Sequence, residues 1–240
     1  MKNKPFRFKE FTIHQDKSAM KVGTDGVLLG AWTEIPTSLN SVLDICAGTG
    51  LIALMLAQRT TAEVIDAVEI EPNAYEQCVE NFENSIWNDR LFCYHADFIE
   101  FAEEIDDKYD LIVCNPPYFK NSEKKNNISA ERKTARFNSS LSFENLIKGV
   151  SALLSENGKF SVIIPFENQE EFIKSAESYH LFCHRITLVK GHKKADFKRS
   201  LLQFSFEKLP LEKKKLIIEI ERHVYTEEYI NLTKDFYLKM

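Results

Sequence analysis

The sequence predicts an α/β fold built on a mainly parallel sheet, and two patterns in the 240-residue chain support it. First, short apolar runs alternate with helix-like segments from residue 41 to about residue 206. Strands separated by helices favour parallel pairing, with helices on both faces of the sheet. Second, the last two of the seven expected strands have no helix between them, which predicts an antiparallel final strand.

Each expected element has a local signal. The strands are expected at residues 41–46, 64–69, 91–95, 109–114, 159–164, 181–189 and 200–206. The helices are expected at residues 51–58, from 72 onward, and at 98–104, 142–154 and 168–178. Pro72 suits a first helical turn, and Ser142 is a suitable N-cap before apolar residues spaced three or four positions apart. Pro165 stops the fifth strand.

Three segments fall outside this alternation, which places the main domain at residues 41–206. Residues 1–40 precede the first strand, and we expect them to close over a ligand site. Residues 119–140 are polar and basic and are expected to form a loop within the main domain. Residues 207–240 contain a strand-like stretch and a helix-like end, which we expect to pack on the same domain.

The charge of the chain is unevenly distributed, although its net value is only −5. Residues 119–138 carry six Lys or Arg against two Glu, and residues 185–215 carry ten against three acids. The rest of the chain is correspondingly acidic. An acidic body with basic edges can engage phosphates at those edges, although ordinary solvated loops have a similar composition.

The cysteine and histidine residues give no sign of a disulfide framework or a metal site. The five cysteines form no C-x-x-C pair, and Cys46, Cys93 and Cys114 lie in or beside apolar runs, as small buried thiols do. The six histidines lack metal-ligand spacing. Neither a signal-peptide pattern nor a membrane-length apolar run is present, so we expect a cytoplasmic protein with no membrane contact and no obligatory protein partner.

The turn after the first strand has the composition of a ligand-binding turn. Gly48 and Gly50 let the backbone approach a ligand closely, and Glu69 ends the second strand, where it can accept from two ribose hydroxyls. Dinucleotide and S-adenosylmethionine folds share this arrangement. Three features favour S-adenosylmethionine over NAD. The G-x-G-x-x-G spacing is absent, Asp44 would repel a pyrophosphate, and Asp97 can accept from an adenine amine or cap a helix.

The strand at residues 109–114 is followed directly by Asn115, Pro116, Pro117 and Tyr118. Neither proline has an N–H to donate, so the two residues end the sheet ladder and stiffen the turn. The Asn115 side chain and the Pro116 carbonyl can accept both hydrogens of an amine, and Tyr118 offers a ring for base stacking. This equipment suits a planar amine that is presented to an electrophile, although a rigid loop alone is an alternative.

The motifs DICAGTG, VEIEP, HADF and NPPY together resemble class I S-adenosylmethionine-dependent methyltransferases that act on an exocyclic or amide nitrogen. The segments KVGTDGVLLGAW and LMLAQR and the closing FYL are narrower markers. With them, nearly the whole chain resembles the bacterial tRNA(Val) adenosine-37 N-6 methyltransferases. The chain departs from this family at Cys46, where many relatives have the first glycine.

The resemblance implies a Rossmann-like class I methyltransferase fold and S-adenosyl-L-methionine as cofactor. The implied cofactor-binding residues are Lys21, Thr24, Asp25, Asp44, Gly48, Gly50, Glu69, Asp97 and Asn115. Thr24 and Asp25 would lie near the methionine end, although the same residues are also typical of a turn before a helix. The implied reaction is methylation of N-6 of adenosine 37 in the anticodon loop of valine tRNA.

The candidate RNA-binding residues are the basic side chains near the Asn115 turn and in the far strands. They are Lys124, Lys125, Arg132, Lys133, Arg136, Lys193, Lys194 and Arg199. Four alternatives remain open: methylation of a guanine or adenine in ribosomal RNA, of an adenine in DNA, of a protein glutamine, and a noncatalytic RNA-binding module. An NAD dehydrogenase is disfavoured by the glycine spacing.

Overall fold

The computed structural model describes residues 4–117 and 141–239 of the chain. Within these ranges, one sheet contains nine strands, and a separate hairpin pairs β1 (Phe6–Arg7) with β2 (Thr12–Ile13). In spatial order the sheet consists of β11 (Val224–Tyr225), β10 (Glu212–Glu221), β8 (Phe182–His192), β9 (Arg199–Ser205), β7 (Leu154–Pro165), β6 (Tyr109–Cys114), β3 (Ser41–Ile45), β4 (Val64–Glu69) and β5 (Leu91–His95).

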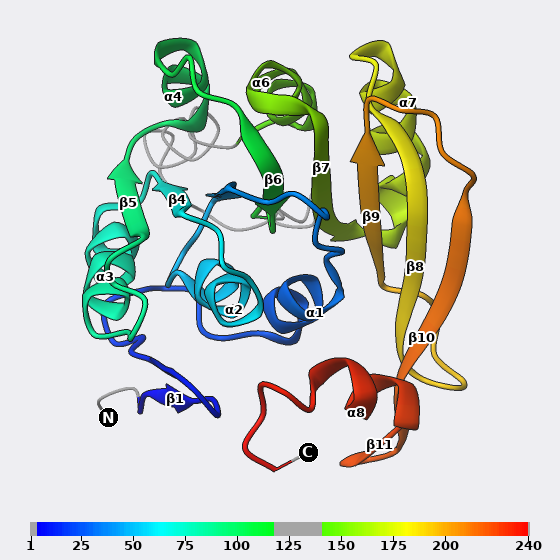
Figure 1. Cartoon of the computed structure of the whole chain (residues 1–240). Coiled ribbons are helices and arrows are strands. Elements are labelled where there is room, and N and C mark those ends of the chain that lie inside the picture. Colours follow the sequence, from blue (N-terminus) through cyan, green and yellow to red (C-terminus); the bar gives the residue numbers. More distant parts are fainter. Residues whose placement is uncertain (1–3, 118–140, 240) are drawn as a thin grey trace, which may run out of the picture.

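Helices cover both faces of this sheet (Figure 1). The helices are α1 (Thr24–Trp32), α2 (Leu51–Arg59), α3 (Pro72–Glu83), α4 (Phe98–Glu104), α6 (Phe143–Leu153), α7 (Gln169–Ser178) and α8 (Glu227–Thr233). The helices α4, α6 and α7 lie on one face, and α1, α2 and α8 lie on the other. Each face buries its own apolar cluster, so the sheet separates two hydrophobic cores.

The seven predicted strands are all present, and the predicted antiparallel arrangement is confirmed: β9 runs antiparallel to both β7 and β8. The sheet extends beyond them, because β10 pairs parallel with β8 and β11 pairs antiparallel with β10. The strand β7 also begins earlier than the sequence predicts, at Leu154 instead of residue 159. Its first residues pair with β6 through a register shift.

The predicted helix starts are confirmed. Pro72 occupies the first turn of α3. The Ser142 hydroxyl accepts a hydrogen bond from the Asn145 backbone N–H at 3.1 Å, so it caps α6. Such a cap satisfies one of the backbone donors that a helix leaves free at its start.

The helix α1 packs closely on α2 through two glycines spaced four residues apart. A methyl group on Gly26 would lie 3.1 Å from Leu51, and one on Gly30 would lie 2.7 Å from the Met55 sulfur. Residues four apart share a helix face, so two side chains of α2 fit against two positions of α1 without side chains. The segment KVGTDGVLLGAW therefore contains a helix-docking surface.

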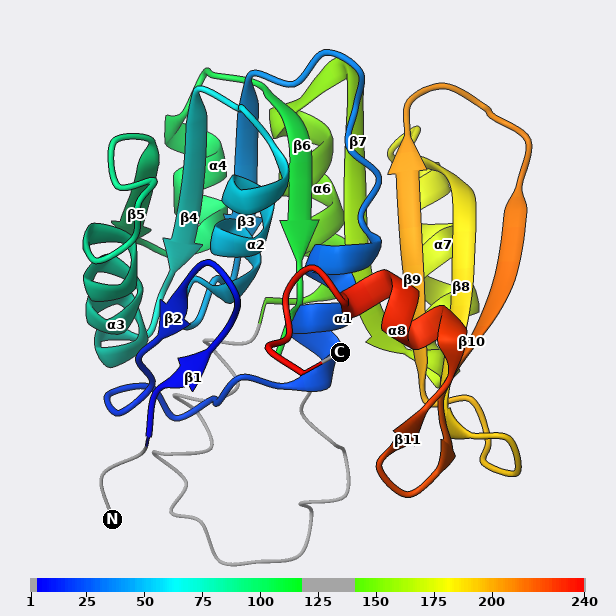
Figure 2. The same ribbon diagram turned by 60° about the horizontal axis from the view of Figure 1, so that its bottom comes forward.

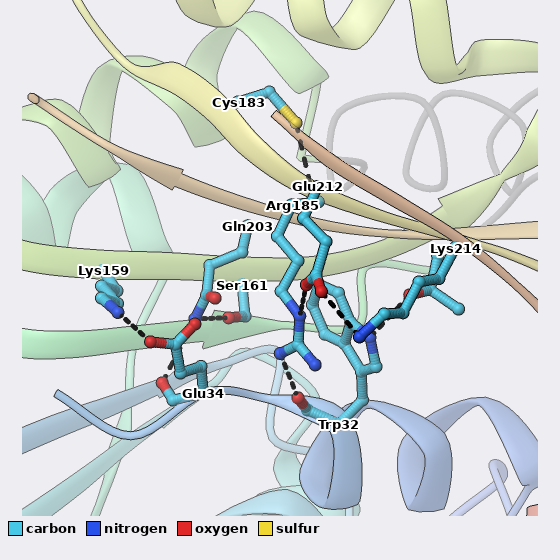
Figure 3. Close-up of polar contacts among 10 residues, drawn as sticks. Trp32, Glu34, Lys159, Ser161, Cys183, Arg185, Gln203, Glu212 and Lys214 are labelled. Carbon is cyan, nitrogen blue, oxygen red and sulfur yellow. Dashed lines mark hydrogen bonds and ion pairs between the residues drawn. The ribbon is translucent and has the colours of Figure 1, made fainter. Parts of the chain in front are cut away.

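Arg185 holds the far end of α1 on the sheet (Figure 3). Its Nη1 donates to the Trp32 carbonyl oxygen at 2.9 Å, and its guanidinium carbon lies 4.3 Å from the centre of the Trp32 ring. Its Nε also donates to Glu212 at 3.2 Å. The Trp32 indole N–H donates to the Thr187 hydroxyl at 2.9 Å. One arginine thus joins α1, β8 and β10.

A second group of contacts fixes the chain just after α1 (Figure 3). Lys159 pairs with Glu34 at 2.5 Å, and this hydrogen bond holds the pKa of Glu34 below its usual value. The Gln203 side chain donates to the Glu34 carbonyl oxygen at 3.2 Å and to the Ser161 hydroxyl at 3.0 Å. Residues from β7 and β9 therefore set the position of α1 relative to the sheet.

The two ends of the described chain pack together beside α2 (Figure 2). Phe8 forms a bridge with Tyr237, and the Lys9 N–H donates to the Phe236 carbonyl oxygen at 2.8 Å. Phe8 and Phe236 are buried in the same core as α1 and α2. In residues 4–117 and 141–239, no helix combines the length and apolar character needed to cross a membrane.

Candidate active site

The predicted site residues follow four neighbouring strands at one edge of the sheet. The strands β3, β4, β5 and β6 are parallel to their neighbours, with Ile45 opposite Cys114 and Glu69 opposite His95. Their carboxyl ends therefore meet at the same edge, which faces downward in Figure 2. Ligands bind at this edge in open parallel sheets, next to the point where the strand order reverses. Here that point lies between β3 and β6.

The two predicted glycines occupy left-handed backbone positions for different reasons. Gly48 has φ 59°, and a methyl group on it would meet no atom within 4 Å. Gly50 has φ 77°, and a methyl group there would lie 2.5 Å from the Phe82 ring. Gly48 thus leaves open space beside the turn, whereas Gly50 permits α3 to pack against the start of α2. Cys46, with φ 60°, adopts the left-handed region despite its side chain.

Glu69 fastens the glycine turn to the end of β4. One carboxylate oxygen accepts from the Gly48 N–H and the other from the Glu71 N–H, both at 2.8 Å. Only 8% of the residue is exposed. Each carboxylate oxygen has a second lone pair, so Glu69 retains the capacity to accept from a pair of hydroxyl groups.

Asp44 is buried in β3 beneath the same turn. One of its oxygens accepts from the Ala53 N–H at 3.1 Å, whereas the other is buried without a hydrogen-bond partner in the described ranges. Burial raises the pKa of Asp44 to about 8, and the neighbouring charge of Glu69 shifts it in the same direction. An orphaned buried acceptor is costly, and a positive charge close to the turn would lower that cost.

Asp97 lies at the start of α4, where its side chain accepts from the Ile99 N–H at 2.7 Å. The predicted N-cap role is therefore confirmed, and the second oxygen can still accept from an amine. The structure adds Ile70, an apolar residue next to Glu69 that is 42% exposed at this edge. Sequence reasoning missed it, although its place directly after a strand-end acid was a usable signal.

Asn115 leaves the end of β6 beside the start of α1. It is partly buried, Pro116 is buried and Pro117 is exposed, while Tyr118 lies outside the described residues. A methyl group on Gly26 would lie 4.0 Å from the Asn115 side-chain nitrogen. The amide is therefore within reach of the first turn of α1, which begins at Thr24.

The other N-terminal candidates have polar partners within the protein. The Lys21 ammonium donates to the backbone carbonyls of Gln15 and Ser18, at 2.7 and 3.0 Å, and so stabilises the segment before α1. Asp25 pairs with Arg199 at 2.6 Å. Arg199, predicted as an RNA-binding residue, thus lies against a residue predicted for the cofactor, at the junction of α1 with β9.

The remaining basic candidates divide into two groups. Lys193 and Lys194 are exposed in the connection between β8 and β9. The others, Lys124, Lys125, Arg132, Lys133 and Arg136, lie outside the described residues. Across the described ranges, His, Cys, Asp and Glu side chains form no group of three suited to a metal ion.

Together, the sheet order, the glycine turn, the strand-end acid and the Asn-Pro-Pro turn define a class I methyltransferase. Comparison with known proteins agrees: the model of the family "Methyltransferase small domain" matches residues 23–176.

Curated relatives give the narrower family. A protein of Flavobacterium psychrophilum named tRNA1(Val) (adenine(37)-N6)-methyltransferase is 59% identical over 98% of this chain and 100% of its own. A Bacteroides fragilis protein of the same name is 49% identical over 98% of both chains. The chain belongs to the tRNA1(Val) (adenine(37)-N6)-methyltransferase family.

Solved structures support the fold alone. Protein Atu636 of Agrobacterium tumefaciens, described as a predicted O-methyltransferase, superposes with a TM-score of 0.68 at 20% identity. That likeness covers 88% of this chain and 96% of the other. The Pyrococcus horikoshii TYW2 structure, a complex with MeSAdo, has a TM-score of 0.57 at 14% identity and covers 83% of this chain and 69% of the other.

Proposed function

We propose that this protein transfers a methyl group from S-adenosylmethionine to N-6 of adenosine 37 in the anticodon loop of valine tRNA. The observation that carries the proposal is the position of Asn115 at the end of β6, one strand from the glycine turn after β3. In this proposal Asn115 grips the acceptor amine beside the turn that binds the cofactor. The names of relatives that match nearly the whole chain support the choice of nucleotide and tRNA.

The described residues at the sheet edge fit the cofactor. Glu69 would accept from its ribose hydroxyls, Asp97 from its adenine amine, and Asp44 would face its positive charge. Gly48 leaves the backbone open to a ligand. Thr24 and Asp25 in α1, and Lys21 in the segment before it, would lie around the methionine end of the cofactor. When bound, S-adenosylmethionine supplies a methyl group already activated by a sulfonium.

The chain's own contribution is to hold the acceptor nitrogen. An adenine amine is a poor nucleophile because its lone pair is delocalised into the ring. The Asn115 side-chain oxygen and the Pro116 carbonyl would accept the two N–H hydrogens, which favours a pyramidal nitrogen and frees that lone pair. The proton can leave after methylation, so no strong base or catalytic histidine is required.

The anticodon loop suits such a site, because its unpaired bases cost less to extrude than bases in a duplex. In this proposal Tyr118 stacks on the extruded adenine. The basic residues between positions 124 and 136 hold phosphates of the anticodon stem. These roles rest on the sequence pattern, because the residues concerned lie outside the described ranges.

The substitution Asn115→Ala separates an enzyme from a noncatalytic binding module. We expect the single-turnover rate constant of tRNA methylation to fall by about 100-fold or more, since one preorganised partner of the reacting group is lost. The melting temperature and the affinity for tRNA should stay near wild type. The measurement is single-turnover methyl transfer together with tRNA binding by fluorescence anisotropy.

Asn231→Ala is the matched control, because Asn231 is exposed on α8, a helix that contains none of the predicted site residues. It should leave both readings unchanged. Normal turnover by the Asn115 variant would overturn the assigned role of this residue. A loss of tRNA binding as large as the loss of turnover would instead point to a binding module.

A further inference from the structure

Phe166 is an exposed aromatic residue beside the Asn115 turn. It directly follows β7, the strand next to β6, and 40% of it is exposed. Cys114 pairs with Val162 in these parallel strands. Asn115 follows Cys114 directly and Phe166 lies four residues after Val162, so both residues leave the sheet at the same edge. The proposed reaction gives Phe166 no role.

Contacts with the connection between β8 and β9 hold Phe166 in place. Its backbone N–H donates to the Lys198 carbonyl oxygen at 3.1 Å, and its ring centre lies 5.7 Å from that of Phe197. The Lys198 N–H in turn donates to the Val189 carbonyl oxygen at 2.9 Å. The ammonium of Lys190 lies 5.4 Å from the centre of the Phe197 ring, within cation–π range. The two rings therefore form a positioned aromatic step at the end of the β8–β9 hairpin.

This aromatic step lies beside a basic segment of the described chain. Residues 190–199 carry five Lys or Arg against one acid, Asp196, and Glu167 is the acid next to Phe166. Lys193 and Lys194 are exposed, and in the described part of the chain neither forms an ion pair. An exposed ring flanked by free cations matches the chemistry of single-stranded RNA, in which bases stack and phosphates pair with lysines.

We propose that Phe166, supported by Phe197, stacks on an unpaired base next to the target adenosine, and that Lys193 and Lys194 hold the adjacent phosphates. The inference rests on the proposed function, because the RNA is the occupant that charge and proximity to Asn115 select. Phe92 provides the contrast. It is 46% exposed on β5, at the other end of the sheet, outside this basic tract.

The first test measures the affinity for an unmodified valine tRNA transcript in Phe166→Ala, Phe166→Trp and Phe92→Ala. Removal of one stacking ring should raise Kd about tenfold and raise KM for tRNA in parallel, with cofactor affinity unchanged. Phe166→Trp should restore both values, which a folding defect would not allow. Phe92→Ala should behave as wild type. Equal Kd values for the two alanine variants would overturn the proposal.

The second test uses the salt dependence of tRNA binding in Lys193→Ala/Lys194→Ala. The slope of log affinity against log salt should become shallower by about 1 to 2, because two phosphate contacts are lost. The control Lys213→Ala/Lys214→Ala removes an adjacent lysine pair of β10 that lies opposite Ile186 and Thr187, in the middle of β8. Lys214 already pairs with Glu212, so this variant should keep the wild-type slope. Identical slopes for both pairs would contradict the assignment.

These outcomes separate the inference from the function on which it rests. If wild-type protein methylates tRNA and Phe166→Ala binds and turns over normally, only the stacking role fails. If wild-type protein transfers no methyl group to tRNA, the proposed function itself fails.

Discussion

Among single residues, Asp44 makes the stability of the folded protein depend on pH. An aspartate in an unfolded chain has a pKa of about 3.9, whereas burial raises the pKa of Asp44 to about 8. Between these values the folded protein retains a proton that the unfolded chain releases. The contribution of Asp44 to stability is therefore largest below about pH 4 and decreases as the pH rises to about 8.

Asp44→Asn tests this sign, because asparagine stays neutral at every pH. We expect the free energy of unfolding of the wild type, measured relative to the variant, to fall as the pH rises from about 5 to about 8. Burial also raises the pKa of Asp66. Groups of this kind are present in both proteins, so their contributions cancel in the difference between wild type and variant. Denaturant titrations across this range provide the measurement. Parallel pH profiles would show that Asp44 is ionised in the folded protein.

Cys46 illustrates what sequence comparison alone misses at this scale. The resemblance marked it as a departure from glycine, and the structure confirms a left-handed backbone there. Burial raises the pKa of the Cys114 thiol, and the neighbouring Cys46 thiol shifts it in the same direction. The Cys46 side chain therefore has a thiol neighbour on β6.

Among the elements, α1 connects the glycine turn to the far half of the sheet. Its first turn lies beside Asn115, its Asp25 pairs with Arg199 of β9, and its last residue is held by Arg185 of β8. The contacts with Arg199 and Arg185 join residues more than 150 positions apart. They explain how an N-terminal helix outside the alternating frame becomes part of the site.

Arg185→Ala should destabilise the protein by about 2 kcal/mol, since it removes a charged hydrogen bond to the Trp32 carbonyl and a cation–π contact. Arg185→Lys should recover only part of this loss, because lysine lacks the planar fork. Arg222→Ala is the control, at an exposed residue of the turn after β10. Urea denaturation measures all three. A loss equal to that of the control would show that Arg185 does not hold α1.

The alternation of strands and helices could be predicted because each signal is local. The bounds of β4, β5, β6 and α4 agree with the predicted ranges. The early start of β7 could not be predicted, because residues 154–158 contain Ser, Glu, Asn and Gly, which are poor strand formers. Nor could the pairing of β10 with β8, because that neighbour is set by the assembled sheet and not by the segment itself.

The part of the site that follows from strand order could be predicted, whereas the contacts made by the assembled fold could not. Asp44, Glu69, Asp97 and Asn115 come together because the carboxyl ends of parallel strands share an edge, which follows from order in the chain. The Asp25–Arg199 pair and the Phe166–Phe197 step depend on the fold of the antiparallel strand β9. No periodicity within the chain indicates such contacts.

For the whole molecule, the segregated charge reconciles a net charge of −5 with an RNA substrate. The cofactor turn, the Asn115 turn and the basic β8–β9 connection all lie along one edge of the sheet. An acidic body disfavours other orientations of a polyanion, so we expect the charge pattern to guide RNA toward the site as well as to bind it.

The most direct test of methyl transfer to adenosine 37 is to map the product. Purified protein is incubated with radiolabelled S-adenosylmethionine and valine tRNA lacking this methyl group, and the RNA is digested and its labelled nucleoside identified and located. We predict labelled N-6-methyladenosine at position 37 and no label in a transcript with guanosine there. Label at another nucleotide, or no label in tRNA despite measurable cofactor binding, would contradict the proposed function.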